Sequence, residues 1–179
     1  FLNEIIIKKF SDPVHDFVNL KDAHITEASY YRLFLTNYLP LEVSNVIYVD
    51  PDVVCLNNVN NKLADIEQFM NDDKFTIAAV TEDIIEIEAN NANRLNLTSK
   101  KYFNAGVLII NITKWRELEV ISNFKKLLNE YSIKLELHDQ DILNLFFDGD
   151  YFELDDIFNF TVPGGGEKYI NKINTSNIK

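Results

Sequence analysis

The chain has 179 residues, 46% hydrophobic and 12% aromatic, so it is long enough for one domain with a continuous core and too apolar to be disordered. Its formal net charge of -11 argues against nucleic acid or an anionic membrane as partner, since both bind clustered Lys and Arg, but suits a divalent cation. The lone Cys55 excludes an internal disulfide framework and a cysteine-based zinc site, and favours a cytoplasmic location. No apolar run approaches the roughly 20 residues of a membrane-spanning helix.

The first third of the chain predicts short strands and helices in alternation. A strand is predicted at residues 4–7, EIII, and a helix at residues 28–39, where Tyr31, Leu35 and Tyr38 recur at helical spacing. Pro40 ends that helix. A buried strand is then predicted at residues 46–50, VIYVD, and after a loop a short helix at residues 61–70.

The remaining elements continue this alternation. Buried strands are predicted at residues 76–80 and 103–110, separated by a charged, Asn-rich surface helix or loop at residues 82–96. Thr113 is the expected N-cap of a helix at residues 113–131, and a last helix is expected at residues 138–147. Buried strands between helices indicate an α/β layered fold with a mostly parallel sheet. Residues 1–162 are expected to form the domain, and the Gly-containing residues 163–179 a mobile surface segment.

Two carboxylates follow the strand at residues 46–50. Asp50 and Asp52 are two apart, so in an extended segment both project to the same side. Ligands of α/β sheets bind at the carboxyl ends of the strands, and paired carboxylates with phosphate oxygens suit Mg²⁺ or Mn²⁺. The alternative is a polar turn in which Asp caps its own backbone.

Three other positions carry candidate polar groups. Asn104 precedes the small pair Ala105-Gly106, which indicates either close approach of a hydroxyl-rich ligand or a β-bulge with a capping Asn. Arg32 is suited to neutralising a phosphate or an acid, or to forming an ordinary surface pair.

The start of the last predicted helix is the third of these positions. Asp139 and Gln140 there are suited to orienting a sugar hydroxyl or stabilising a developing cation, whereas the alternative is that Asp139 and Asp141 complement the helix dipole. His24 and His138, taken alone, are more typical of surface or capping histidines than of ligands.

Four ordered motifs resemble glycosyltransferase family 8, the retaining galactosyl- and glucosyltransferases of the bacterial lipopolysaccharide type and the glycogenin group. They are H-I-T-E-A-S-Y-Y-R-L, I-Y-V-D-P-D-V-V, Y-F-N-A-G-V-L-I-I-N-x-x-x-W-R and H-D-Q-D-I-L-N. The resemblance runs from about residue 24 to residue 160 and implies a GT-A-like fold, incomplete at both ends. It implies hexose transfer from a UDP-sugar, UDP-galactose or UDP-glucose, to a saccharide or glycolipid acceptor with retention of configuration.

Site roles follow from the same resemblance, residue by residue. The metal ligands for Mn²⁺, or Mg²⁺, are Asp50 and Asp52, and the groups beside the anomeric carbon are Asp139 and Gln140. The donor-binding residues are His24, Arg32, Glu82, Asn104, Ala105 and Gly106. In a full-length protein, a cytoplasmic location peripheral to the inner membrane is expected.

The chain also departs from the family's sequence pattern, and two alternative functions stay open. The family's opening strand and nucleotide-binding segment, and its closing H-x-x-G-x-x-K-P-W stretch, are not found, so the chain is expected to be a fragment, a partly resolved protein or the product of a truncated reading frame. A truncated, non-catalytic binding module is one alternative. A haloacid-dehalogenase-like phosphatase is another, with Asp50 as nucleophile and Asp52 as acid/base.

Overall fold

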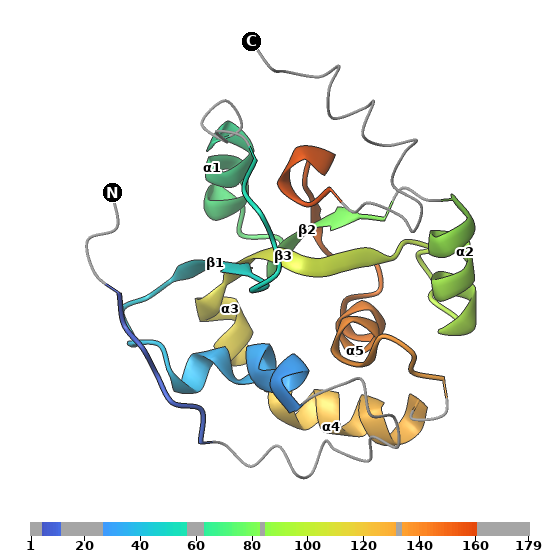
Figure 1. Ribbon diagram of the computed structural model, residues 1–179, viewed down its shortest axis with the longest axis horizontal. Coiled ribbons are helices and arrows are strands. Elements are labelled where there is room, and N and C mark those ends of the chain that lie inside the picture. The colour runs from blue at the N-terminus through green and yellow to red at the C-terminus, as the bar shows by residue number, and fades with distance from the viewer. Residues whose placement is uncertain (1–4, 12–26, 57–62, 83–84, 132–133, 161–179) are drawn as a thin grey trace.

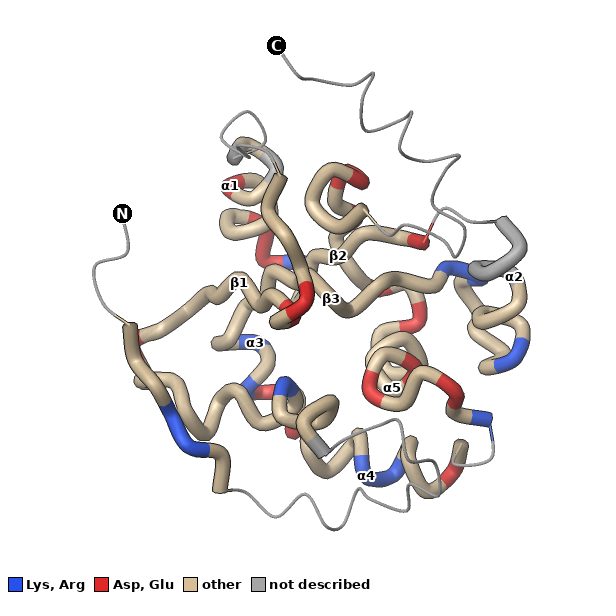
Figure 2. The backbone as a smooth tube through the Cα atoms, in the orientation of Figure 1, with Lys and Arg blue, Asp and Glu red and all other residues tan. Residues whose placement is uncertain are grey.

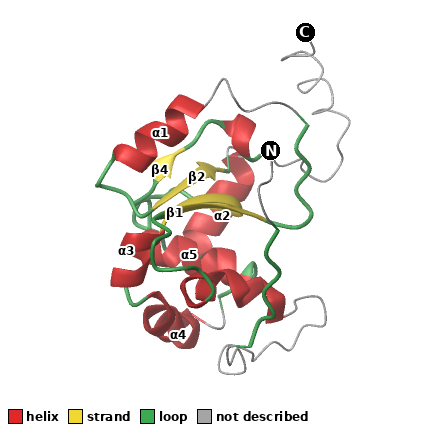
Figure 3. Cartoon of the chain, turned by 90° about the vertical axis from the view of Figure 1, so that its left-hand side faces the viewer, coloured by secondary structure: helices red, strands yellow, loops and turns green. Residues whose placement is uncertain are grey.

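The computed structural model describes residues 5–11, 27–56, 63–82, 85–131 and 134–160. These residues form a mixed α/β fold around a four-stranded sheet. Helix α1 (Leu63–Asn71) lies on one face of the sheet, and α3 (Ile112–Glu117), α4 (Val120–Tyr131) and α5 (His138–Phe147) lie on the other (Figures 1 and 3). Helix α2 (Ile85–Arg94) lies beyond one end of the strands. No helix formed by these residues is long and apolar enough to cross a membrane.

The strand order of the sheet is β1 (Asn45–Val49), β3 (Phe103–Asn111), β2 (Ile77–Thr81) and β4 (Phe152–Glu153). β3 is antiparallel to both β1 and β2, whereas β2 and β4 are parallel. The expected mostly parallel sheet is therefore wrong for the described strands. The reason is that β3 is covered on both faces, so its apolar run lacks the alternation that usually indicates an antiparallel strand.

β3 contains a bulge that shapes the site described below. Opposite β2, Ala78 pairs with Ile109 but Val80 pairs with Asn104, so β3 carries extra residues between these pairs. Opposite β1, pairing runs from residue 111 only as far as residue 107. The segment of β3 at residues 103–106 therefore has no strand partner on the β1 side.

Two apolar clusters join the sheet to its helices. The larger packs β3 against the helical layer and includes Leu108, Phe124 and Leu143. The smaller packs Phe69 of α1 and Ala78 of β2 on the opposite face. Both faces of the central strands are thus covered, which fixes β3 and its bulge in place.

The helix before β1 is a 3₁₀ helix, η2 (Glu27–Asn37), and its buried face differs from the expected one. A 3₁₀ helix repeats every three residues. Accordingly Tyr30 and Leu33 are fully buried, whereas Tyr31 is exposed. Arg32 of the same helix is also buried, with only 9% of its surface exposed.

The long helix expected at residues 113–131 is two helices, α3 and α4. Asn111, not Thr113, is the N-cap, since its side chain accepts a hydrogen bond from the backbone N–H of Lys114 at 3.0 Å. Glu119, in the left-handed region with φ +46°, separates the two helices.

Most of the other helices lie close to the residue ranges that the sequence predicted. The helices expected near residues 61–70 and 138–147 are present as α1 and α5, and the segment at residues 82–96, where a surface helix or loop was expected, contains the helix α2. Residues 5–7 form no strand, and Ile5, Ile6 and Ile7 are exposed. His24 and residues 163–179 lie outside the described residues, so the donor contact expected of His24 and the mobility expected of that segment stay predictions.

Candidate active site

Four segments meet where β1 ends: the turn after β1, the bulge of β3, the first turn of α5 and the buried side of η2. Figure 2 shows acidic residues on the chain after β1 and on the first turn of α5. Each segment contributes a side chain that the sequence singled out, namely Asp50, Asn104, Asp139 with Gln140, and Arg32.

Arg32 connects three of these segments. Its Nη2 donates to Asp50 Oδ1 at 2.8 Å, and its Nη1 donates to the carbonyl oxygen of Ala105. Its Nε lies 2.8 Å from Asp139 Oδ2 as an ion pair, but the two are not aligned as a hydrogen bond, and neither atom has a hydrogen-bond partner among the described residues. The guanidinium carbon also lies 4.6 Å from the ring centroid of Tyr48. One cation therefore holds two carboxylates from distant parts of the chain.

Asp139 has a perturbed acidity. Burial raises its pKa from the ordinary 3.8 to about 6, and the nearby charge of Asp50 adds to the effect. Arg32 acts in the opposite direction but does not outweigh burial. A carboxyl group with a pKa near neutrality, next to a cation, is typical of functional sites.

Side chains of α5 replace the missing strand partner along the bulge of β3. Gln140 Oε1 accepts from the backbone N–H of Ala105 at 2.9 Å. One turn later, Asn144 Oδ1 accepts from Phe103 N at 2.8 Å and its Nδ2 donates to Phe103 O at 2.9 Å. These bonds satisfy backbone groups that would otherwise be buried and unpaired. They fix the first turn of α5 against β3.

Asn104 lies at the centre of a second hydrogen-bonded group. Its Oδ1 accepts from Gly106 N and from Asn159 Nδ2, both at 2.8 Å, and its Nδ2 donates to Glu82 Oε1 at 3.1 Å. The bulge with a capping Asn is thus confirmed, and the same side chain also belongs to the cluster. Burial raises the pKa of Glu82, and its Oε2 is buried without a hydrogen-bond partner in the described part of the chain. Gln140 Nε2 also reaches Glu82 Oε1, at 3.4 Å.

Asp141 lies two residues after Asp139 but in a different environment. It is fully buried, and Arg94 of α2 donates two hydrogen bonds to it, Nη1 to Oδ2 at 2.8 Å and Nη2 to Oδ1 at 3.0 Å. The backbone N–H groups of Glu136 and Leu137 donate to Oδ2 at 2.8 and 2.9 Å. Burial acts to raise the pKa of Asp141, but these hydrogen bonds outweigh it and hold the pKa below its usual value.

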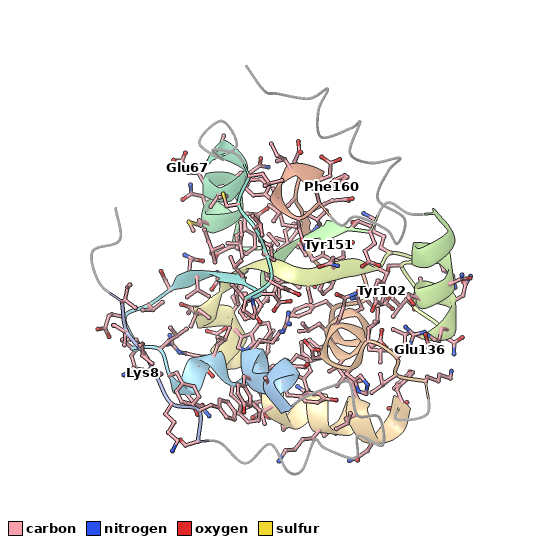
Figure 4. All side chains as sticks on the ribbon, in the orientation of Figure 1. Lys8, Glu67, Tyr102, Glu136, Tyr151 and Phe160 are labelled. Carbon is pink, nitrogen blue, oxygen red and sulfur yellow. The ribbon has the colours of Figure 1, made fainter. Side chains whose placement is uncertain are left out.

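Tyr102 links this buried pair to the candidate site. Figure 4 labels it beside α5, toward α2. Its hydroxyl donates to Asp141 Oδ1 at 2.6 Å and accepts from Gln140 Nε2 at 3.2 Å. Gln140 is therefore held from both ends of its amide, by Ala105 and by Tyr102.

Asp50 and Asp52, the candidate cation ligands, differ in their surroundings. Asp50 Oδ1 accepts from Arg32 and from the hydroxyl of Tyr48, while Oδ2 lies on the side of Gly106. Asp52 is exposed in the turn that follows. Among the described residues no cluster of three His, Cys, Asp or Glu is placed to hold a metal alone. Two hard carboxylates fit Mg²⁺ or Mn²⁺ that keeps further positions for water and phosphate oxygens.

The structure thus brings together most of the predicted site residues: Arg32, Asp50, Glu82, Asn104, Ala105, Gly106, Asp139 and Gln140. Sequence reasoning missed the supporting residues Tyr48, Arg94, Tyr102, Asn144 and Asn159. Two of these had a local signal: Tyr48 precedes Asp50 by two positions in a strand, and Asn144 follows Gln140 by one helical turn. A groove of about 450 Å³ lies elsewhere, between η2, α3 and α4, and includes none of the site residues.

The fold is that of GT-A glycosyltransferases. The galactosyltransferase LgtC, solved in complex with donor and acceptor sugar analogs, matches with a TM-score of 0.67 and 26% identity, over 80% of this chain and 50% of that chain. The glycosyltransferase GlyE of Streptococcus pneumoniae TIGR4 shares the fold, with a TM-score of 0.54 and 23% identity over 85% of this chain and 32% of that one. The GT-A-like class expected from the sequence is confirmed.

Sequence comparison narrows this class to a family. The sequence model described as Glycosyl transferase family 8 matches residues 2–178, and the chain belongs to that family. The lipopolysaccharide 1,2-glucosyltransferase of Escherichia coli is 35% identical over 122 residues, 66% of this chain and 34% of that protein. General stress protein A of Bacillus subtilis is 33% identical over 139 residues, 75% of this chain and 46% of that protein. The chain therefore spans between a third and a half of these relatives, and family membership argues against the phosphatase alternative.

Proposed function

We propose that this domain transfers a hexose, galactose or glucose, from a UDP-sugar to a glycan or glycolipid acceptor, with retention of configuration and with Mn²⁺ as the preferred cation. The observation that supports it most is the contact of Arg32 with both Asp50 and Asp139. That contact joins the proposed cation ligand to the proposed sugar-side acid in a family 8 chain. Relatives named as lipopolysaccharide glucosyl- and galactosyltransferases agree with the choice of hexose.

The proposed roles at the phosphate end rest on charge. Asp50 and Asp52 hold the divalent cation, which when bound offsets the negative charge of the leaving diphosphate. Arg32 lies beside Asp50 and is almost fully buried, so its charge is weakly screened and favours an anionic donor. Because the Arg32 guanidinium lies 2.8 Å from Asp50 Oδ1, we assign both side chains to the same phosphate group.

The proposed roles at the sugar end rest on oriented oxygens. The carboxylate of Asp139 and the amide oxygen of Gln140 face the positive charge that develops at the anomeric carbon. Because the pKa of Asp139 is about 6, this carboxylate is mostly ionised at neutral pH and able to stabilise that charge. Asn104 and Glu82, whose Oε2 lacks a partner among the described residues, bind sugar hydroxyls.

Calorimetry tests the proposal on the 179-residue chain. UDP-glucose and UDP-galactose are titrated with and without Mn²⁺, and we expect at least one to bind in a Mn²⁺-dependent manner. Asp50→Asn should abolish the Mn²⁺ dependence. Asp73→Asn is the matched control, because the Asp73 side chain is fully exposed and its ion pair, at 4.0 Å, is with Lys114 rather than with a site residue. Equal binding with and without Mn²⁺ would count against the cation site.

Turnover separates the enzyme from a binding module. Release of UDP in the presence of an acceptor saccharide supports transfer, whereas Mn²⁺-dependent binding of UDP-sugar without any UDP release supports a non-catalytic module. Absence of UDP-sugar binding altogether would remove the basis for both.

A further inference from the structure

A fifth segment reaches the candidate active site from beyond β4. The chain there forms a single 3₁₀ turn, η4 (Asp156–Phe158), capped by the carboxylate of Asp155, which accepts from a backbone N–H two residues later at 3.1 Å. Asn159 follows, and its backbone N–H donates to Asp156 O at 3.2 Å. Phe158 packs against the apolar cluster of α1 and β2. The position of Asn159 is therefore fixed by a capped turn and by the core.

The side chain of Asn159 lies over Gly106. A Cβ atom on Gly106 would be 3.0 Å from Asn104 Oδ1, 3.5 Å from Asp50 Oδ2 and 3.7 Å from Asn159 Nδ2. Polar atoms from β3, from the end of β1 and from the chain after η4 thus surround one small space. A glycine leaves this space open, as is common where a ligand approaches a strand closely.

Asn159 helps to fix the orientation of the Asn104 side chain. Asn104 Oδ1 accepts from both Gly106 N and Asn159 Nδ2, so both of its lone pairs are used. The amide of Asn104 is thereby oriented with Nδ2 toward Glu82. Without Asn159, one of the two bonds that fix this orientation is lost.

The side chain of Asn159 itself has a hydrogen-bond donor and an acceptor that no described residue uses. Its Nδ2 carries two hydrogens, of which the bond to Asn104 uses one, and its Oδ1 accepts no hydrogen bond from any described residue. The side chain is half-buried. A half-buried amide oxygen next to the glycine space is suited to accept from a ligand hydroxyl.

We propose that Asn159 is a further residue of the sugar subsite. It positions Asn104 through the 2.8 Å bond, and its Oδ1 accepts from a hydroxyl of the bound hexose. The identity of the ligand rests on the proposed function, whereas the positioning of Asn104 does not require any ligand. The two parts are therefore tested separately.

The positioning is tested by NMR on the ligand-free protein. The reporters are the backbone amide of Gly106 and the side-chain amide of Asn104 in ¹⁵N-labelled chain. We expect Asn159→Ala and Asn159→Asp to shift both signals, because neither variant donates to Asn104 Oδ1. Asn129→Ala, at an exposed position of α4, should shift neither. Unchanged Gly106 and Asn104 signals in a folded Asn159 variant would overturn the proposal, whether or not a UDP-sugar binds.

The sugar contact is tested by calorimetry with UDP and with UDP-hexose in the presence of Mn²⁺. Loss of one hydrogen bond should weaken UDP-hexose binding by Asn159→Ala about tenfold, and UDP binding should be unchanged because UDP carries no hexose. Equal weakening of UDP and UDP-hexose, or of neither, would overturn the sugar contact. Failure of the wild-type chain to bind either ligand would overturn the proposed function instead, and the NMR result would then decide the role of Asn159.

Discussion

The buried pair of Arg94 and Asp141 offers the sharpest test of how the site is held. Arg94→Met removes the guanidinium but keeps much of its aliphatic volume. It leaves Asp141, fully buried, without its cation and without two charge-assisted hydrogen bonds. Breaking a buried ion pair from one side costs about 3–5 kcal/mol. Asp141 keeps the bonds from Tyr102, Glu136 and Leu137, so we expect the lower end, about 3 kcal/mol.

Thermal unfolding measures this loss. For a chain of this size, 1 kcal/mol corresponds to roughly 2–4 °C in Tm, so Arg94→Met should lower Tm by about 6–12 °C. Lys101→Met is the matched control, because it breaks the Lys101–Glu153 pair, which has the same N···O distance of 2.8 Å but side chains 48% and 51% exposed. An exposed pair contributes under about 1 kcal/mol, so the control should shift Tm by no more than about 4 °C.

The pH dependence gives an independent check of the same pair. The pKa of Asp141 is lowered in the folded protein, so its contribution to stability is present above the unfolded pKa of about 3.9 and is lost as pH falls through the folded pKa. The gap in Tm between wild type and Arg94→Met should therefore narrow below about pH 4. Equal Tm losses for Arg94→Met and Lys101→Met at neutral pH would refute the claim that burial makes this pair strong.

Three further predictions concern single side chains. Gly149 has φ +86°, and a Cβ atom at this position would clash with Ser99 Cβ. Gly149→Ala should therefore lower the free energy of unfolding, measured in urea, by about 1–3 kcal/mol. A variant as stable as wild type would contradict the clash. Tyr102→Phe removes the hydrogen bond to Asp141 and should lower the free energy of unfolding by about 1.5–3 kcal/mol in the same assay. In ¹⁵N NMR the side-chain amide signal of Gln140 should shift, because Tyr102 accepts a hydrogen bond from it. An unshifted amide signal would mean that Tyr102 does not hold Gln140. Burial raises the pKa of Asp139 to about 6, so its ionised form is disfavoured in the folded state and the penalty grows as pH rises from about 4 to about 6. Asp139→Asn should therefore raise Tm at about pH 7.5 and lose this advantage at about pH 4, and a gain at both pH values would point to another cause.

The sequence predicted the acids and amides of the site because they occupy positions with local meaning. Asp50 comes directly after an apolar strand, and Asp139 and Gln140 open a helix with a clear apolar face. The elements themselves were also predictable, since β1, β2, β3 and α5 each have a distinct run or periodicity. The strand directions were not predictable, because direction depends on which strands become neighbours. The apolar pattern of a strand that is covered on both faces does not indicate whether its neighbours are parallel or antiparallel.

The supporting partners could not be predicted for a related reason. Arg94 is separated from Asp141 by 47 positions and Asn159 from Asn104 by 55, so no local periodicity links either pair. Tyr102 precedes the bulge of β3, and its hydroxyl meets Asp141 only once α5 has packed against that strand. These contacts are consequences of the tertiary fold rather than of any short segment.

Asp139 and Asp141 show what the fold adds to a motif. In the sequence they flank Gln140 symmetrically and both suit the helix dipole, and the resemblance to the family assigns a site role to Asp139 but not to Asp141. In the fold, Asp141 faces Arg94, Tyr102 and two backbone amides, which saturate its oxygens and lower its pKa. Asp139 faces Arg32 with one buried oxygen that has no hydrogen-bond partner in the described residues, and its pKa is raised to about 6. An acid whose oxygens are all used can only hold the structure, whereas an acid with unused capacity and a pKa near neutrality is able to respond to a ligand. The difference between anchor and candidate catalytic group is therefore decided by how fully each buried carboxylate is hydrogen-bonded. Arg94 from α2 donates two hydrogen bonds to Asp141, whereas Arg32 from η2 pairs with Asp139 without an aligned hydrogen bond.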